Sequence, residues 1–219
     1  NECMTETDYE LERNKVSISG KNLGEVEIFQ AKYTPELKML APAVSKTLET
    51  LLLRHAPYAQ HTPRDYRFFV FETNANKEIS LDAYVKRHTD YSYLSPASYL
   101  GALILLERLL EKNRQLVISE YNIHLLFATA LRIAGKVIDL STINNERFAK
   151  VGGIKTNYLN ALEYMFLVYL GFDAFISAQE FIMWRDKLLP HLIGKDLQGH
   201  RRLPPTGIPG ALFQPYSAT

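Results

Sequence analysis

The amino-acid sequence predicts an all-α protein, with only minor extended segments near the N-terminus. Apolar residues recur at intervals of three and four along much of residues 34–193, and this is the period of an amphipathic helix. Residues that favour the N-cap position, among them Ser80, Ser95 and Ser177, stand directly before several of these apolar runs. We therefore expect one helical domain at residues 34–193, flanked by an N-terminal arm and a C-terminal tail.

The composition is that of one ordinary globular domain. Of the 219 residues, 47% are hydrophobic and 22% are charged, so the chain can bury a core without a disulfide or metal. The net charge of +1 gives no electrostatic reason to expect nucleic acid or a membrane surface as a partner. Cys3 is the only cysteine, which excludes a disulfide framework and fits a reducing compartment. No apolar stretch has the length that a bilayer span needs.

The two ends of the chain differ from its middle. In residues 1–33, Gly20, Asn22 and Gly24 separate short alternating runs, a pattern that fits either a weak hairpin or an irregular arm. Residues 194–219 are rich in proline and glycine, which predicts a tail.

The first helix is expected between Pro42, near its start, and Pro57, after its end. Four apolar residues at helical spacing indicate it: Val44, Leu48, Leu51 and Leu52. A long connection, residues 57–79, follows. In it, the aromatic stretch at 66–71 predicts a short extended segment against the core. Ser80 then caps a short helix that ends near His88.

From Ser95 onward the sequence predicts one helix after another. The first begins with Pro96, at a position that tolerates proline, and runs to about Lys112. Its buried side is expected to hold Leu100, Leu103, Ile104 and Leu110. Three more helices are expected at about 121–138, 158–170 and 177–190. The last begins with a capping-box pattern, in which Glu180 stands three residues after Ser177.

The helices at 121–138 and 158–170 are apolar on nearly every side. The polar residues that interrupt them are few: Thr129, Arg132 and Lys136 in the first, after His124, and Asn160 and Glu163 in the second. A helix that is apolar all round has to be covered by other helices. Both are therefore expected at the centre of a compact bundle.

Lys136 and Glu163 need an explanation, because a charge on a mostly buried helix is costly unless it is paired or reaches an edge. In one interpretation the two form an internal ion pair with no further role. In the other they lie at the rim of the bundle and point toward the backbone of another protein. Physical chemistry alone favours neither.

Several stretches resemble the cyclin box, the helical domain of the cyclins. They are residues 95–109, residues 122–130 with Gly135 and Lys136, residues 144–154, and residues 159–163 followed by Phe166, Leu170 and Phe172. The most specific, Asn-Asn-Glu-Arg-Phe-Ala-Lys-Val-Gly-Gly-Ile at 144–154, resembles the hallmark of the P/U-type cyclins. Residues 79–84 resemble the segment that precedes the box. The resemblance covers about residues 43–190.

The resemblance implies a single five-helix cyclin box with flanking helices, the fifth helix being a short one at 144–150. It also implies a regulatory subunit, not an enzyme, that binds and activates a cyclin-dependent serine/threonine protein kinase. Such a subunit holds the mobile glutamate-bearing helix of the kinase inward.

Further expectations follow from the resemblance. The chain would act inside the cell, in the cytoplasm or nucleus, in cell-cycle control or nutrient sensing. It would need no cofactor, small-molecule substrate, nucleic acid or membrane. The alternative is a cyclin-box scaffold that binds transcription machinery or nucleic acid without activating a kinase, and the near-neutral charge argues against it.

The resemblance also assigns kinase-contact residues by position. Lys136 and Glu163 match the lysine and glutamate that hydrogen-bond to the kinase backbone, and this favours the partner role over a purely internal pair. The apolar pocket for the kinase helix matches Ile133, Val137, Leu167 and Ala174. Asp139 matches the first of two acidic residues that often follow the lysine. Leu140 stands where the second is usual, which puts that contact in doubt.

Motifs of other chemistries are incomplete. Residues 152–156 lack the Gly-Lys-Ser/Thr ending of a phosphate-binding loop, and no strand is predicted before them. The six histidines are scattered without metal-ligand spacing, and no Gly-x-Ser-x-Gly elbow occurs. A helical enzyme is therefore disfavoured.

Overall fold

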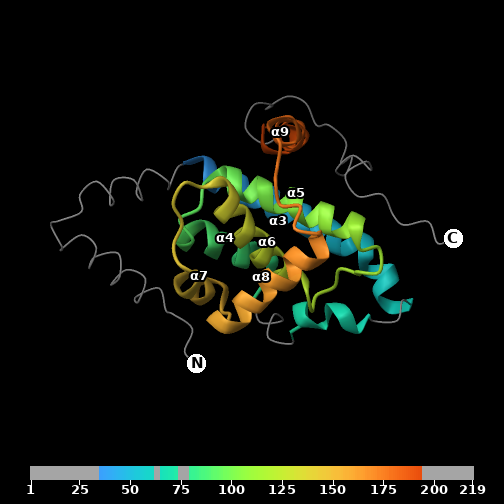
Figure 1. Ribbon diagram of the computed structural model, residues 1–219. Coiled ribbons are helices and arrows are strands. Elements are labelled where there is room, and N and C mark those ends of the chain that lie inside the picture. The colour runs from blue at the N-terminus through green and yellow to red at the C-terminus, as the bar shows by residue number, and fades with distance from the viewer. Residues whose placement is uncertain (1–34, 62–64, 74–78, 194–219) are drawn as a thin grey trace.

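A computed structural model of the chain describes residues 35–61, 65–73 and 79–193, and within these residues the fold is entirely helical (Figure 1). The all-α prediction is thereby confirmed. The weak hairpin or arm expected at residues 1–33 and the tail expected at 194–219 lie outside the described residues. Among the described helices, none combines the length and the apolar character that crossing a bilayer needs.

The described residues form seven α-helices and one 3-10 helix. In chain order they are α3 (Pro35–His61), the 3-10 helix η1 (Tyr66–Phe71), α4 (Leu81–Tyr91), α5 (Pro96–Lys112), α6 (Ile123–Ile138), α7 (Asn145–Gly152), α8 (Thr156–Leu170) and α9 (Ala178–Ile193). The short helix α7 is present, so the five helices expected from Ser95 onward are α5 to α9.

Local capping explains where several of these helices begin and end. The hydroxyl of Ser80 accepts a hydrogen bond from the Ala83 N–H, and the side chain of Asn144 accepts one from the Arg147 N–H. Ser95 caps α5, as predicted. At their C-terminal ends, α7 and α8 are followed by Gly153 and Gly171, both with left-handed backbone.

The helix α3 is longer than predicted. Pro42 and Pro57, which were expected near its start and after its end, both lie inside it. A proline in a helix removes one backbone hydrogen bond and crowds the preceding turn. Here Val44, Leu48 and Leu51 are fully buried, so packing against the rest of the bundle offsets that cost. In the same way α9 continues past Pro190.

The aromatic stretch at 66–71 is a 3-10 helix, not an extended segment. Phe68 and Phe71 are buried, and their rings lie 4.9 Å from Tyr169 and 6.3 Å from Phe166 of α8, respectively. The predicted contact with the core is confirmed, whereas the predicted extended conformation is wrong. Residues three apart share one side of a 3-10 helix, so this pattern also suits such a turn.

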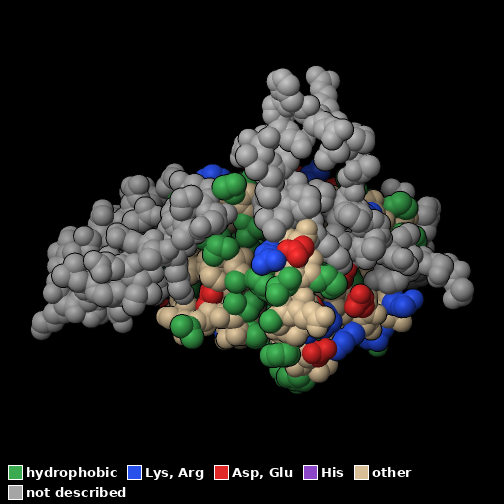
Figure 2. All heavy atoms as spheres, turned by 90° about the horizontal axis from the view of Figure 1, so that it is seen from above, with side chains coloured by type: hydrophobic (Ala, Val, Ile, Leu, Met, Phe, Trp, Pro, Cys, Tyr) green, Lys and Arg blue, Asp and Glu red, His purple; other side chains and the backbone are tan. Residues whose placement is uncertain are grey.

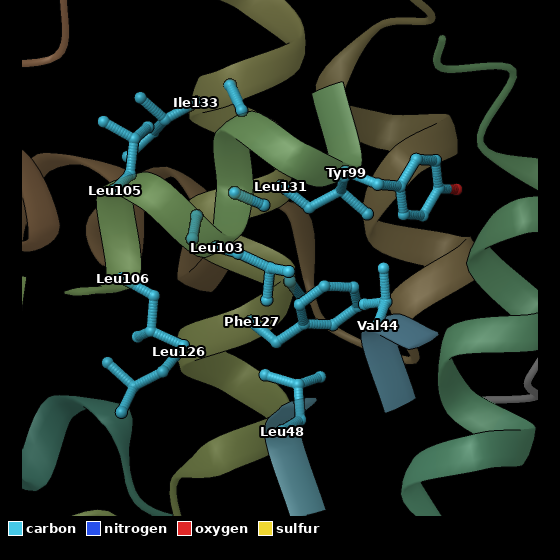
Figure 3. Close-up of a cluster of buried hydrophobic side chains, with 14 of the residues drawn as sticks. Val44, Leu48, Tyr99, Leu103, Leu105, Leu106, Leu126, Phe127, Leu131 and Ile133 are labelled. Atoms are coloured by element: carbon cyan, nitrogen blue, oxygen red, sulfur yellow. The ribbon is translucent and has the colours of Figure 1, made fainter. Parts of the chain in front are cut away.

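The centre of the fold is the pair α5 and α6. Every residue of α6 from Ile123 to Gly135 is buried, and Figure 3 shows Phe127 of this helix beside Val44 and Leu48 of α3. Glycine allows the two helices to come close: a Cβ at Gly101 would lie only 2.5 Å from the Cδ1 of Ile138. The four residues expected on the buried side of α5 are all buried.

The helix α8 does not lie at the centre. One side of it packs on α5, α6 and α7, and this side holds the buried residues Leu159, Leu162, Glu163, Phe166 and Leu170. On its other side, Tyr164 is 63% exposed and Val168 is 39% exposed. The prediction that both apolar helices are central is therefore confirmed for α6 and wrong for α8.

Candidate functional site

The two charges singled out by the sequence meet where α6 packs on α8. Lys136 lies in the last turn of α6, and its Nζ is 2.5 Å from the Oε2 of Glu163 in α8. The Glu163 side chain is only 9% exposed, whereas that of Lys136 is 42% exposed. The internal ion pair is therefore present, and its lysine also reaches the surface.

A third helix joins this pair through Asn145, the first residue of α7. Its Nδ2 donates to the Oε1 of Glu163, at 2.5 Å, and to the Oδ1 of Asn160, at 2.6 Å. Its own Oδ1 accepts a hydrogen bond of 2.7 Å from the Nε of Arg132. These five side chains, Arg132, Lys136, Asn145, Asn160 and Glu163, are called the polar cluster below.

Arg132 is the buried end of the polar cluster. Its guanidinium lies 5.3 Å from the ring of Phe148, a cation–π contact, and burial lowers the pKa of Arg132 while the charge of Glu163 opposes that shift. With Arg132 and Lys136 cationic and Glu163 anionic, the cluster carries one surplus positive charge. Lys136 brings that charge to the surface, where it can donate to carbonyl oxygens of another chain.

Apolar side chains lie next to the polar cluster along both helices. Ile133 is buried one turn before Val137 on α6, and Val137 is exposed. Leu167 on α8 is partly buried, as is Ala174 in the segment after α8. The structure thus places the four apolar residues predicted for the pocket on α6, on α8 and just beyond it, beside the exposed Tyr164 and Val168.

The segment after α8 is clamped by two cations of α5. Arg108 donates from Nη1 to the carbonyls of Asp173, at 2.6 Å, and Phe175, at 2.9 Å. Lys112 donates to the Leu170 carbonyl and to the Asp173 carboxylate, both at 2.9 Å. The hydrogen bond from Lys112 and the charge of Arg108 lower the pKa of Asp173. The clamp fixes the backbone that carries Ala174.

Arg108 also binds Glu180. The sequence did not predict this contact, because the capping-box pattern already accounts for Glu180. Glu180 lies in the first turn of α9, and its N–H donates to the hydroxyl of Ser177. The Glu180 carboxylate, however, accepts two hydrogen bonds from the Nη2 of Arg108, at 2.7 and 2.8 Å.

Exposed apolar residues continue onto α9, and Figure 2 shows hydrophobic side chains gathered on the face seen from above.

Asp139, the remaining predicted contact residue, has a partner within the chain. It follows the last residue of α6, and its Oδ2 accepts a hydrogen bond of 3.0 Å from the Ser95 N–H. This bond ties the end of α6 to the start of α5. Leu140, which follows it, is fully exposed.

Comparison with known proteins identifies the family. The family model described as Cyclin matches residues 16–174, which is most of the chain. This chain belongs to the cyclin family. Cyclins are regulatory proteins.

The curated relatives include plant cyclins of the U and P types. Cyclin-U2-1 of Arabidopsis thaliana is 31% identical over 144 residues, which is 64% of this chain and 65% of the relative. Cyclin-P4-1 of Oryza sativa subsp. japonica is 33% identical over 111 residues, 51% of this chain and 52% of the relative. The chain thus covers less than two thirds of their length. These relatives support the P/U-type assignment made from residues 144–154.

Sequence reasoning noticed every member of the polar cluster but not their arrangement. Helical spacing predicts Arg132 and Lys136 on one stripe of their helix, and Asn145 stands out only as part of the family motif. In the cyclin fold, the start of α7 lies between α6 and α8, so Asn145 reaches both Arg132 and Glu163.

Proposed function

We propose that this cyclin binds and activates a cyclin-dependent serine/threonine protein kinase and performs no catalysis itself. The observation that carries the proposal is the Lys136–Glu163 pair, which is half exposed on the lysine side and lies beside uncovered apolar side chains. A large exposed apolar area rimmed by charged groups is typical of a protein-binding surface.

The pair offers both kinds of hydrogen-bonding group that a backbone needs. Lys136 has three N–H donors and gives one to Glu163 within the described residues, so others remain for backbone carbonyls of the kinase. Each carboxylate oxygen of Glu163 accepts one described hydrogen bond and has a second lone pair for a backbone N–H. The pair can therefore hydrogen-bond to the end of a partner helix, where backbone N–H and carbonyl groups lack partners within that helix.

The apolar residues supply most of the affinity in this proposal. Apolar side chains of the kinase helix pack against Val137, Leu167 and Ala174, with the buried Ile133 supporting them, while the charged pair sets their orientation. Asp139 contributes less, because its carboxylate already binds the Ser95 N–H. Holding the kinase helix inward completes the lysine–glutamate pair that positions the ATP phosphates, which is how binding becomes activation.

The test is a kinase assay in which the purified cyclin is mixed with each cyclin-dependent kinase of the same organism in turn. We expect one of them to be activated by the wild type. Glu163→Ala should weaken binding by about 30-fold or more, because it leaves partner groups buried and unpaired.

Glu146→Ala is the matched control for this assay. Glu146 lies at the start of α7 and is exposed, and its one contact within the described residues is a 3.7 Å pair with Lys150, so its loss should leave binding unchanged. Circular dichroism checks that both variants keep their helices. Equal binding by Glu163→Ala and wild type would contradict the contact assignment, and binding without activation would favour the scaffold alternative.

A further inference from the structure

Asn145 is the one side chain of the polar cluster that bonds to both a cation and the carboxylate. It accepts from the buried Arg132 and donates to Glu163, so it connects the two through its own amide. Because Arg132 lies on α6 and Glu163 on α8, this amide also joins three helices.

The amide suits both sides of this position because it accepts from Arg132 and donates to Glu163. An aspartate could accept from Arg132, but it could not donate to Glu163 and would place a second negative charge beside it. A leucine has a similar shape but neither accepts nor donates. The asparagine is thus matched to one donor on one side and one acceptor on the other.

Asn145 also holds its end of the carboxylate more firmly than Lys136 holds the other end. Lys136 is half exposed and has a flexible four-carbon stem. Asn145 begins a helix that is fixed by the Asn144 cap and by the buried Phe148. A short side chain on a fixed backbone restricts the Oε1 of Glu163 in a way that the lysine cannot.

We propose that Asn145 is a positioning residue for kinase binding, which orients the Glu163 carboxylate toward the partner backbone. This inference rests on the proposed function, because it assigns Asn145 a role in the same contact. It differs from a purely structural role, since it requires that Asn145 act on affinity through Glu163.

Loss of Asn145 also disturbs Arg132, so a structural effect has to be separated. Within the described residues, the buried Nη1 of Arg132 already lacks a hydrogen-bond partner, and Asn145→Leu removes the acceptor of its Nε as well. Asn145→Asp keeps an acceptor for Arg132 but replaces the donor to Glu163 and Asn160 with a second negative charge. A loss of affinity shared by both variants is therefore not due to the missing acceptor for Arg132.

The cap of another helix supplies a matched control. Ser80→Ala removes the cap of α4 but no described bond to the polar cluster, so it should lower the denaturation midpoint without changing kinase affinity more than twofold. With the kinase found in the activation assay, we expect Asn145→Leu and Asn145→Asp each to lower affinity by about tenfold. An unchanged affinity in both, while Glu163→Ala weakens binding, would overturn this inference and leave the proposed function intact.

A double-mutant cycle tests whether the effect passes through Glu163. In a Glu163→Gln background, Asn145→Leu should change affinity by less than about twofold, because the carboxylate that it orients is gone. A full tenfold loss in that background would overturn the inference. If Glu163→Ala itself leaves binding unchanged, the contact that Asn145 is proposed to serve is absent and the inference falls, whereas the proposed function fails only if the wild type activates no kinase.

A crystal structure of unbound Asn145→Leu gives a readout that needs no kinase. We expect the Glu163 carboxylate to leave the position that it holds in the wild type, with its contact to Lys136 loosened. A carboxylate in its wild-type position would overturn the inference even if the affinity of this variant were low.

Discussion

The helices α6 and α8 are similar in sequence and opposite in surroundings. Both are apolar with few polar interruptions, yet α6 is buried from Ile123 to Gly135, whereas α8 buries one stripe and exposes Tyr164 and Val168. An apolar helix sequence therefore predicts that the helix is buried, but it does not tell whether the same chain or a partner chain buries it. For α6 the cover is this chain's own α5, and for α8 we propose that it is the kinase.

The largest expected effect is on the buried helix. Phe127→Ala should lower the free energy of unfolding by about 3–5 kcal/mol, because Phe127 is fully buried and the substitution leaves a cavity. Urea denaturation of the purified cyclin measures this loss. Tyr164→Ala on the exposed side of α8 is the comparison, and its loss should stay within about 0.5 kcal/mol.

Acid should weaken the region around α6 through His88. This residue is fully buried, with its ring 6.1 Å from Phe127 and 5.1 Å from Phe148, and burial and the Arg87 charge lower its pKa to about 3. Burial likewise lowers the pKa of His55 to about 4.

Both histidines are neutral in the folded state, but in the unfolded chain they take up a proton near pH 6.5. Their contribution to stability is therefore complete above pH 6.5 and is lost as the pH falls from 6.5 toward 4 and then 3. The loss is at most about 1.4 kcal/mol per pH unit for each histidine. Denaturation at several pH values measures it. His88→Gln should reduce this pH dependence, and an unchanged slope would contradict the assignment.

Lys136→Ala tests the charged boundary between the two helices. Lys136 is half exposed but its partner Glu163 is buried, so its removal should lower stability by about 1–3 kcal/mol, because the carboxylate loses its cation. Kinase affinity, measured by titration calorimetry, should fall by about tenfold. Lys150→Ala, which removes an exposed lysine of α7, should leave affinity unchanged. Equal affinities for all three proteins would remove Lys136 from the proposed contact.

The smallest expected change in stability is on the outer side of α8. Val168→Asp should alter the free energy of unfolding by less than about 0.5 kcal/mol while lowering kinase affinity by about tenfold or more, since a charge would enter an apolar contact. A stability loss comparable to that of Phe127→Ala would break the comparison, because it would show that another part of this chain covers α8.

The sequence predicted helices best where the signal is local. The bounds of α5 were predicted correctly, because Ser95 and Pro96 mark its start and the apolar spacing continues to Lys112. Prolines misled the prediction of α3, since their local cost is offset by packing that the sequence does not display. The exposure of α8 was missed for a related reason: periodicity does not distinguish burial within a chain from burial against a partner.

For the site, residue types were predictable and their connections were not. Two charges in apolar helices indicated that Lys136 and Glu163 must be paired or at an edge, and both descriptions hold. The link through Asn145 depends on where the start of α7 lies relative to α6 and α8, and spacing along the chain does not determine this. Arg108 and Glu180 meet across 72 positions, so no local pattern connects them.

The close pairing of α5 and α6 has a consequence for the order of folding. These helices are neighbours in the chain, so their contact closes a short loop and costs little chain entropy. During synthesis, residues 96–138 leave the ribosome before α8 is complete and can already form the centre of the domain. The apolar side of α8 is thus displayed on a scaffold that is largely assembled, which limits the time that a nascent chain spends with both its core and its partner surface exposed to aggregation.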